Sequence, residues 1–200
     1  MMATDLPFRF DPVAHRYTLV GSDEELPHIT GLLEADGLNQ NARWMTAESK
    51  VRGSAVHRLA ADYDREALTD VIGSWSYYKG WLHAYAKAMS EIPHRWDFIE
   101  MPFVHPYHRF GGRPDRGGLA YGAVAVLDLK SGGAEDGHPI QTALQAILIA
   151  PHLNLPPHRI ERYALYLKQN GHYGLEHHPR RRDFDRAYRI IRDYCRSSAA

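Results

Sequence analysis

The order of hydrophobic and polar positions divides the chain into a mainly helical first half and a second half that alternates strands with helices. Period-two alternation on both sides of Asp11–Pro12 predicts a short hairpin over 8–10 and 15–20. Apolar residues spaced three and four positions apart then predict helices. These helices are expected over 31–38, 53–66 and about 74–91.

After Pro93 the apolar spacing changes to the period of β-strands. The clearest strand is 123–130, AVAVLDLK, which is apolar on both faces, as in a central strand covered on two sides. Further strands are predicted over 96–104, 107–112, 159–168 and 172–176, and helices over 139–149 and 183–196. This order predicts an α/β fold with a central mixed β-sheet flanked by helices.

The length of 200 residues is that of one domain with its own core. Within this single domain we expect an N-terminal hairpin and short helix (1–40), a helical part (41–92), a sheet and helix that carry the chemistry (93–168), and a C-terminal strand and helix (169–200).

Several classes of protein are disfavoured. The apolar runs are far shorter than the ~20 residues of a membrane span, so we expect no membrane partner. The N-terminus shows no basic region followed by an apolar stretch, so no secretory signal is expected. The single Cys195 excludes an internal disulfide, a four-cysteine zinc site and an iron–sulfur cluster, and it favours a cytoplasmic location.

The charge balance is neutral, with 24 Lys and Arg against 24 Asp and Glu. Nucleic-acid-binding proteins are usually basic, so neutrality counts mildly against DNA as a partner. The charges are uneven, however, because acidic residues prevail in the first fifty positions and basic ones in the last fifty. In the net charge, an acidic cluster around a metal would also cancel basic residues elsewhere in the chain. A net charge of zero therefore does not exclude DNA binding.

The apolar strand 123–130 ends with two charged residues on one face, Asp128 and Lys130. Burying such charges costs several kcal/mol unless they are paired or bound to a metal. By itself, Asp-x-Lys is more often an exposed strand end.

Three other residues point to the same place. Asp115 lies thirteen residues before Asp128, at the end of the preceding predicted strand, so adjacent strands would bring the two acids together. Glu100 interrupts an apolar strand, and His57 lies in a helix among apolar residues. Carboxylates together with a histidine can hold a hard divalent cation. Lys130 beside them would orient a water or stabilise negative charge on a phosphate.

Ordinary explanations stand beside these hypotheses. His57 alone is typical of a core histidine, and Glu100 could instead pair with Arg113 or Arg116. Two histidine pairs have the spacing of zinc ligands, His105 with His108 and His172 with His177, but no cysteine accompanies them. The aromatic residues of 75–85 have the spacing of a helix core, which we favour over base stacking.

Five segments together resemble the PD-(D/E)XK nuclease superfamily, in particular its RecB-like and phage-exonuclease-like branch. They are RGSAVH with His57, FIEMPF with Glu100, GGRPD with Asp115, VLDLKSG with Asp128 and Lys130, and HPIQTALQ with Gln141. The resemblance spans about residues 8–168. It implies a restriction-endonuclease-like core and a Mg²⁺-dependent deoxyribonuclease that accepts Mn²⁺ as a substitute.

The resemblance also implies a metal site. Asp115 and Asp128 would be its principal ligands, together with the backbone carbonyl of Leu129. Glu100 would bind the metal directly or through water, and His57 would complete the site from its helix.

The remaining roles concern the substrate. Lys130 would orient the attacking water and stabilise the transition state, and Gln141 would hold Lys130 or the DNA backbone. Arg113 and Ser131 are candidate phosphate contacts. Gln145 stands where the family often has tyrosine, and it could take over the part of Gln141.

We therefore expect an exonuclease that hydrolyses DNA in phage-type recombination or repair. The sequence contains no helicase motif, so unwinding would need a recombination or helicase partner protein. An endonuclease of restriction or structure-specific type with the same active site is an alternative, as is a catalytically inactive DNA-binding or interaction domain of the same fold. A homo-oligomer is left open.

Overall fold

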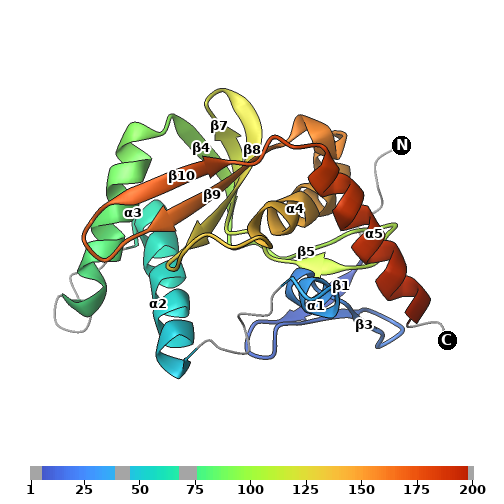
Figure 1. The fold of residues 1–200 in the computed structure, drawn as a ribbon. Coiled ribbons are helices and arrows are strands. Elements are labelled where there is room, and N and C mark those ends of the chain that lie inside the picture. Colours follow the sequence, from blue (N-terminus) through green and yellow to red (C-terminus); the bar gives the residue numbers. More distant parts are fainter. Residues whose placement is uncertain (1–5, 39–45, 68–75, 198–200) are drawn as a thin grey trace.

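A five-stranded mixed sheet forms the centre of the molecule (Figure 1). The computed structural model describes residues 6–38, 46–67 and 76–197. The strand order is β10–β9–β8–β7–β4, and only β8 and β9 run parallel. The strands are β4 (His94–Ile99), β7 (Arg116–Ala120), β8 (Ala123–Lys130), β9 (Glu161–Leu167) and β10 (Tyr173–His177). The predicted central mixed sheet is confirmed.

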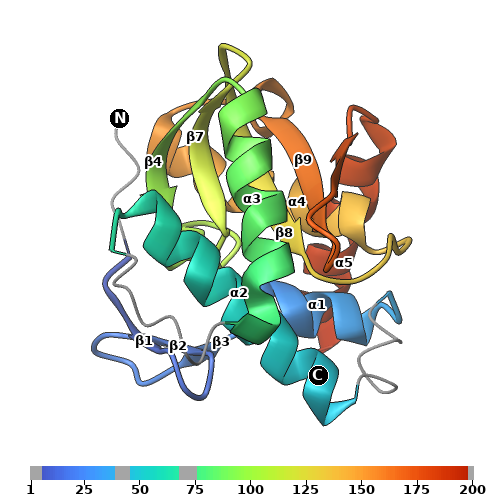
Figure 2. The same ribbon diagram turned by 90° about the vertical axis from the view of Figure 1, so that its left-hand side faces the viewer.

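Helices cover both faces of this sheet (Figures 1 and 2). On one face lie α2 (Ala47–Asp64) and α3 (Lys79–Glu91), the latter preceded by the 3₁₀ turn η2 (Ser76–Tyr78). On the other lie α4 (His138–Leu153) and α5 (Arg182–Ser197), and α1 (Ile29–Ala35) packs against both of these. The short η3 (Pro157–Arg159) leads from α4 into β9.

Strand β8 contributes to two hydrophobic cores because its side chains alternate between the two faces. Val126 packs into the core under α4 and α5, whereas Leu127 and Leu129 pack into the core under α2 and α3. This confirms the prediction of a central strand covered on both sides.

A smaller sheet precedes the helices, with β1 (Phe8–Asp11), β2 (Arg16–Leu19) and the unpredicted β3 (Glu25–Leu26). The predicted hairpin of β1 and β2 is confirmed. The ring of Tyr17 fits against Gly111, where an added Cβ would lie 2.3 Å from a ring carbon. This contact joins the small sheet to the rest of the molecule.

Two predicted strands are wrong in their extent. The strand expected over 96–104 divides into β4 and β5 (Phe103–Val104), because Glu100 adopts a left-handed conformation with φ 50°. The strand expected over 107–112 shrinks to β6 (Gly111–Gly112), because residues 106–108 form a turn. The expected helix start near position 74 lies outside the described residues.

Two further predictions concern membrane spans and the single cysteine. None of the helices in the described part of the chain combines the length and the apolarity of a membrane span. Cys195 is a free, exposed thiol.

Candidate active site

The β7–β8 hairpin brings the two predicted aspartates to one end of the sheet. The hairpin pairs Arg116 with Leu127, and Asp115 directly precedes β7. The N–H of Leu129 donates a hydrogen bond to Asp115 Oδ2 at 2.6 Å. The expected position of Asp115 at the end of a strand is wrong, because it stands at the start of one. The antiparallel pairing nevertheless places it beside the segment 128–130.

Glu100 reaches the same place because the chain turns sharply there. Its left-handed φ of 50° is a conformation that costs a non-glycine residue about 1–3 kcal/mol. The N–H of Glu100 donates to the carbonyl oxygen of Asp115 at 3.0 Å, which holds the turn in place. Glu100 therefore lies beside Asp115 although the two come from different segments.

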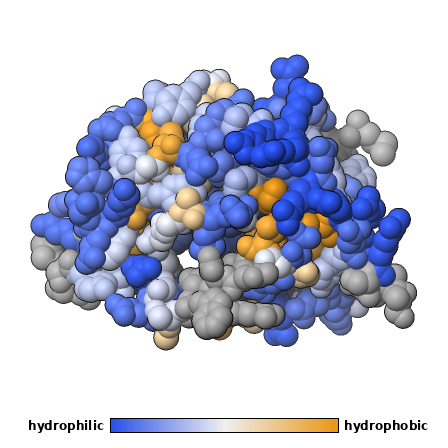
Figure 3. All heavy atoms as spheres, viewed as in Figure 1, coloured by the Kyte–Doolittle hydropathy of each residue, from blue (hydrophilic) through white to orange (hydrophobic). Residues whose placement is uncertain are grey.

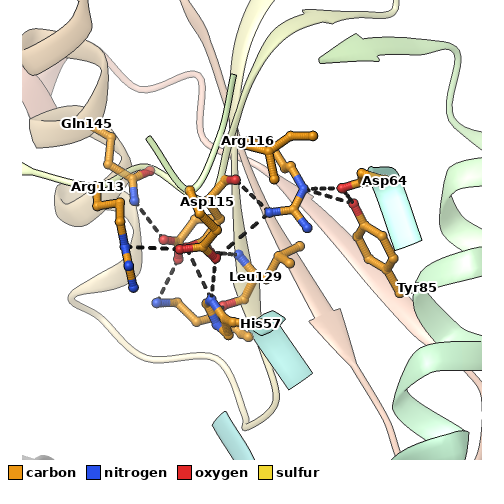
Figure 4. A network of polar contacts seen from close by, with 12 residues as sticks. His57, Asp64, Tyr85, Arg113, Asp115, Arg116, Leu129 and Gln145 are labelled. Carbon is orange, nitrogen blue, oxygen red and sulfur yellow. Dashed lines mark hydrogen bonds and ion pairs between the residues drawn. The ribbon is translucent and has the colours of Figure 1, made fainter. Parts of the chain in front are cut away.

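His57 joins the two acids from α2 (Figure 4). Its Nδ1 lies 3.2 Å from Asp115 Oδ1 and 3.4 Å from Glu100 Oε1, and its Nε2 lies 3.1 Å from the carbonyl oxygen of Leu129. One possible ligand atom from each of His57, Glu100 and Asp115 falls within 4.8 Å of the others. Four segments thus converge on one point.

The charges in this cluster are strongly coupled. Burial lowers the pKa of His57, but the carboxylates of Asp115 and Glu100 outweigh it and raise the pKa to about 10. Burial likewise raises the pKa of Asp115, but His57 and the Leu129 N–H bring it below its ordinary value. Without a metal, a protonated His57 therefore pairs with the ionised Asp115 at neutral pH.

Asp128 is held differently. Its Oδ1 accepts hydrogen bonds from Gln141 Nε2 (3.0 Å) and Gln145 Nε2 (2.7 Å), and its Oδ2 lies 2.7 Å from Lys130 Nζ. Lys130 Nζ also donates to Gln141 Oε1 at 2.8 Å. Burial raises the pKa of Asp128. Both glutamines thus contact the carboxylate, and only Gln141 also contacts the lysine.

The donor atoms suit a divalent cation. Carboxylates of Glu100 and Asp115 and the carbonyl of Leu129 are oxygen ligands of the kind that Mg²⁺ and Mn²⁺ prefer. Glu100 Oε1 is buried and accepts no well-aligned hydrogen bond from any described residue. A buried carboxylate oxygen in this state is well suited to a cation. A nitrogen ligand from His57 would require that the imidazole first lose its proton.

The candidate phosphate contacts lie at the edges of the cluster. Arg113 Nε is 3.1 Å from Glu100 Oε2, and its guanidinium lies over the ring of Phe10. Arg116 Nη1 is 3.9 Å from Glu100 Oε1, so both of the arginines considered as partners of Glu100 lie near it. Ser131 is half-buried directly after β8.

A buried polar network behind the acids was not foreseen. Arg116 is fully buried and donates to the carbonyl oxygen of Asp115 at 2.6 Å. Its Nε also donates to Asp64 Oδ2 and, at 3.0 Å, to the hydroxyl of Tyr85, which in turn donates to Asp64 at 2.6 Å. In the sequence, only the arginine directly after Asp115 pointed to this network. Asp64 and Tyr85 belong to α2 and α3, and nothing in the sequence linked them to Arg116.

The zinc-like histidine pairs have other roles. His105 Nδ1 accepts hydrogen bonds from the N–H groups of Tyr107 and His108, so it closes the turn that replaces the expected strand. His177 Nε2 lies 2.7 Å from Glu161. Within the described residues, the His57 cluster is the one group of at least three potential metal ligands.

Two cavities lie next to each other along α2 and share Gly53 and His57 in their walls. One, of about 510 Å³, lies between α2 and the loop after β8, and we call it the inner groove. The other, of about 730 Å³, lies beside Glu100 and Arg113, and we call it the outer groove. Hydrophilic residues cover most of the face shown in Figure 3.

Comparison with known protein families and with curated proteins gives no match to this chain.

Proposed function

We propose that the chain is a metal-dependent DNA nuclease with a restriction-endonuclease-like core and a PD-(D/E)XK active site of the RecB-like type. The observation that carries this proposal is the contact of Lys130 with Asp128 and Gln141, next to an Asp115 that shares its surroundings with His57 and Glu100. A purely structural ion pair would not need this second cluster of acids beside it.

The basic side chains around the site support an anionic substrate. The two grooves are lined by Lys50, Arg52, Arg58, Arg65, Arg113 and Lys130. The acids lining them are Glu100 and Glu135. In a chain of zero formal net charge, this is a local excess of positive charge of the kind that binds a phosphate backbone.

Hydrolysis would use the residues as follows. His57, Glu100, Asp115 and the carbonyl of Leu129 would hold Mg²⁺ or Mn²⁺, with Asp128 as the further expected ligand. The bound cation would supply a more acidic water and charge neutralisation at the phosphate.

Lys130 would orient that water and stabilise the negative charge that develops on the phosphate oxygens. Gln141 would keep the ammonium group in place through the 2.8 Å hydrogen bond. Because water is the nucleophile, no covalent intermediate forms on the protein.

We favour an exonuclease that acts on DNA ends in phage-type recombination or repair, together with a recombination or helicase partner. The test is incubation with linear and with covalently closed circular DNA, in Mg²⁺, Mn²⁺ or EDTA. Metal-dependent loss of the linear substrate alone is expected. Nicking of the circle would instead indicate an endonuclease, and no hydrolysis of either DNA would contradict the proposal.

Lys130→Ala is expected to lower the hydrolysis rate at least 100-fold, because the developing charge loses its cationic partner. The matched control is Lys168→Ala, which removes an exposed lysine that lines neither groove. Both variants should keep Mn²⁺ binding, measured by calorimetry, and Asp115→Asn should lose it. Unchanged hydrolysis by Lys130→Ala would overturn the role of Lys130.

A further inference from the structure

Gly53 lies in the interior of α2, where glycine is unfavourable. A Cβ added there would meet only Ser131 Oγ, at 3.9 Å, so packing leaves room for a side chain. Gly80 in α3 is different, because its Cβ would lie 1.6 Å from the carbonyl oxygen of Gln169. Close packing thus explains Gly80, but nothing within the described part of the chain requires a glycine at position 53.

Gly53 has a special place relative to the active site. Ser49, Gly53 and His57 are four residues apart, so they form one row along α2. His57 points into the metal-ligand cluster, and so this row faces the active site. Both grooves include Gly53 and His57 in their walls. The inner and outer grooves are therefore neighbours at this row, and the gap between them is at position 53, where no side chain stands.

Basic residues stand on both sides of this gap. Arg52 and Lys130 line the inner groove, whereas Lys50, Arg65 and Arg113 line the outer one. The guanidinium of Arg52 lies 5.9 Å from the centre of the Trp81 ring, which limits its freedom to move. A chain of phosphates that passed from one groove to the other would meet positive charge before and after His57.

We propose that a single nucleic-acid strand crosses α2 at Gly53, with its backbone against the glycine and the reacting phosphate beside His57. The row from Ser49 to His57 spans eight residues, or about 12 Å along the helix axis. The gap is that of one absent side chain, which suits the backbone of one strand rather than a duplex. The inference rests on the proposed nuclease function and specifies the form of its substrate.

The test fills the gap with a side chain. Gly53→Gln should weaken binding of a fluorescein-labelled single-stranded oligonucleotide at least tenfold, measured by fluorescence anisotropy in EDTA so that no hydrolysis occurs. Gly53→Ala should bind like the wild type. Both variants should raise Tm by about 2–4 °C, because each removes a glycine from a helix interior. The matched control is Val51→Gln, since Val51 is 61% exposed on the same helix and lines neither groove.

The outcomes separate this inference from the proposed function. If Gly53→Gln folds, hydrolyses DNA and binds the single strand like the wild type, the crossing is wrong although the nuclease function stands. Weaker binding of duplex with unchanged binding of the single strand would also overturn it. A wild-type protein that hydrolyses no DNA in Mg²⁺ or Mn²⁺ refutes the function itself. If Gly53→Gln fails to fold, Ser49→Gln obstructs the same row, and wild-type binding by that variant overturns the inference.

Discussion

Arg116 is a buried residue that supports the backbone of the candidate site. Its guanidinium is 0% exposed and lies between Asp64 and Tyr85 on one side and the carbonyl of Asp115 on the other (Figure 4). A buried cation is tolerated only with such partners. The network thereby fixes the backbone of Asp115, whose carbonyl also accepts the N–H of Glu100.

We predict that Arg116→Met lowers the free energy of unfolding by about 3–5 kcal/mol, because Asp64 is left as a buried, unpaired charge. Tyr85→Phe removes the two hydrogen bonds of the hydroxyl group, with Asp64 and with Arg116, and should cost about 1–3 kcal/mol. Arg95→Met breaks the exposed pair with Asp97 and should cost less than about 1 kcal/mol. Urea unfolding of the three variants measures the order, and equal losses for Arg116→Met and Arg95→Met would contradict it.

His105 makes the stability depend on pH. Burial is the main reason that its pKa falls to about 3, and its Nδ1 already accepts two backbone hydrogen bonds. The unfolded chain takes up a proton below about pH 6.5, whereas the folded protein does so only near pH 3. The contribution of His105 is therefore complete above pH 6.5 and is lost as the pH falls toward 3.

Between pH 7 and pH 5, this residue should reduce the free energy of unfolding by about 2 kcal/mol. His105→Asn can still accept hydrogen bonds but does not titrate. Its loss of stability over the same interval, measured by urea unfolding at both pH values, should be smaller than the wild-type loss by about that amount. Equal pH dependence in the two proteins would show that His105 is protonated in the folded state.

At the scale of elements, the β7–β8 hairpin decides whether the acids meet. Its loop is Tyr121–Gly122, with φ values of 51° and 79°, and positive φ at both central positions is the type I′ geometry. This tight loop sets the register that brings Asp115 to the segment 128–130. Asn at the first position is preferred over Tyr in such turns.

Tyr121→Asn is predicted to stabilise the protein by about 0.5–1 kcal/mol, and Gly122→Ala to destabilise it by about 1–2 kcal/mol. Thermal unfolding of the two variants measures these opposite shifts. A loss of stability in Tyr121→Asn would indicate that the ring contact with Tyr163, at 6.0 Å between centroids, outweighs the turn geometry.

At the scale of the whole molecule, the sheet joins two cores into one unit, because β8 contributes side chains to both. Trp81 and Trp96 belong to the core under α2 and α3, whereas Leu148 belongs to the core under α4 and α5. A substitution that destabilises one core should therefore also destabilise the other.

Leu148→Ala is predicted to lower the free energy of unfolding by about 2–5 kcal/mol. Tryptophan fluorescence and far-UV circular dichroism should report the same lowered urea midpoint, although Leu148 lies across the sheet from Trp81 and Trp96. Leu165→Ala, in the core with those tryptophans, is the matched comparison. Separate midpoints for the two probes would show that the cores unfold independently.

Much of the architecture follows from local patterns. The strand 123–130 is found with the predicted bounds. Its signal is a continuous apolar run, which involves only residues that are neighbours in the sequence. The helices were predicted with boundary errors, and the chain from Trp96 to Gly112 was predicted less well. In this stretch, the left-handed conformation of Glu100 depends on a hydrogen bond with Asp115, and the turn at 106–108 depends on hydrogen bonds to the side chain of His105. The pattern of hydrophobic and polar residues carries no information about such hydrogen bonds.

The sequence alone identified the residue types of the candidate site, because charged residues stand where apolar ones were expected. Their grouping was decided by the tertiary structure. It placed Asp115 at the start of a strand, set His57 between Asp115 and Glu100, and tied Asp128 to Lys130, Gln141 and Gln145. The physical reason is that periodicity describes one element at a time, whereas a buried charge is stable only with partners that distant elements supply.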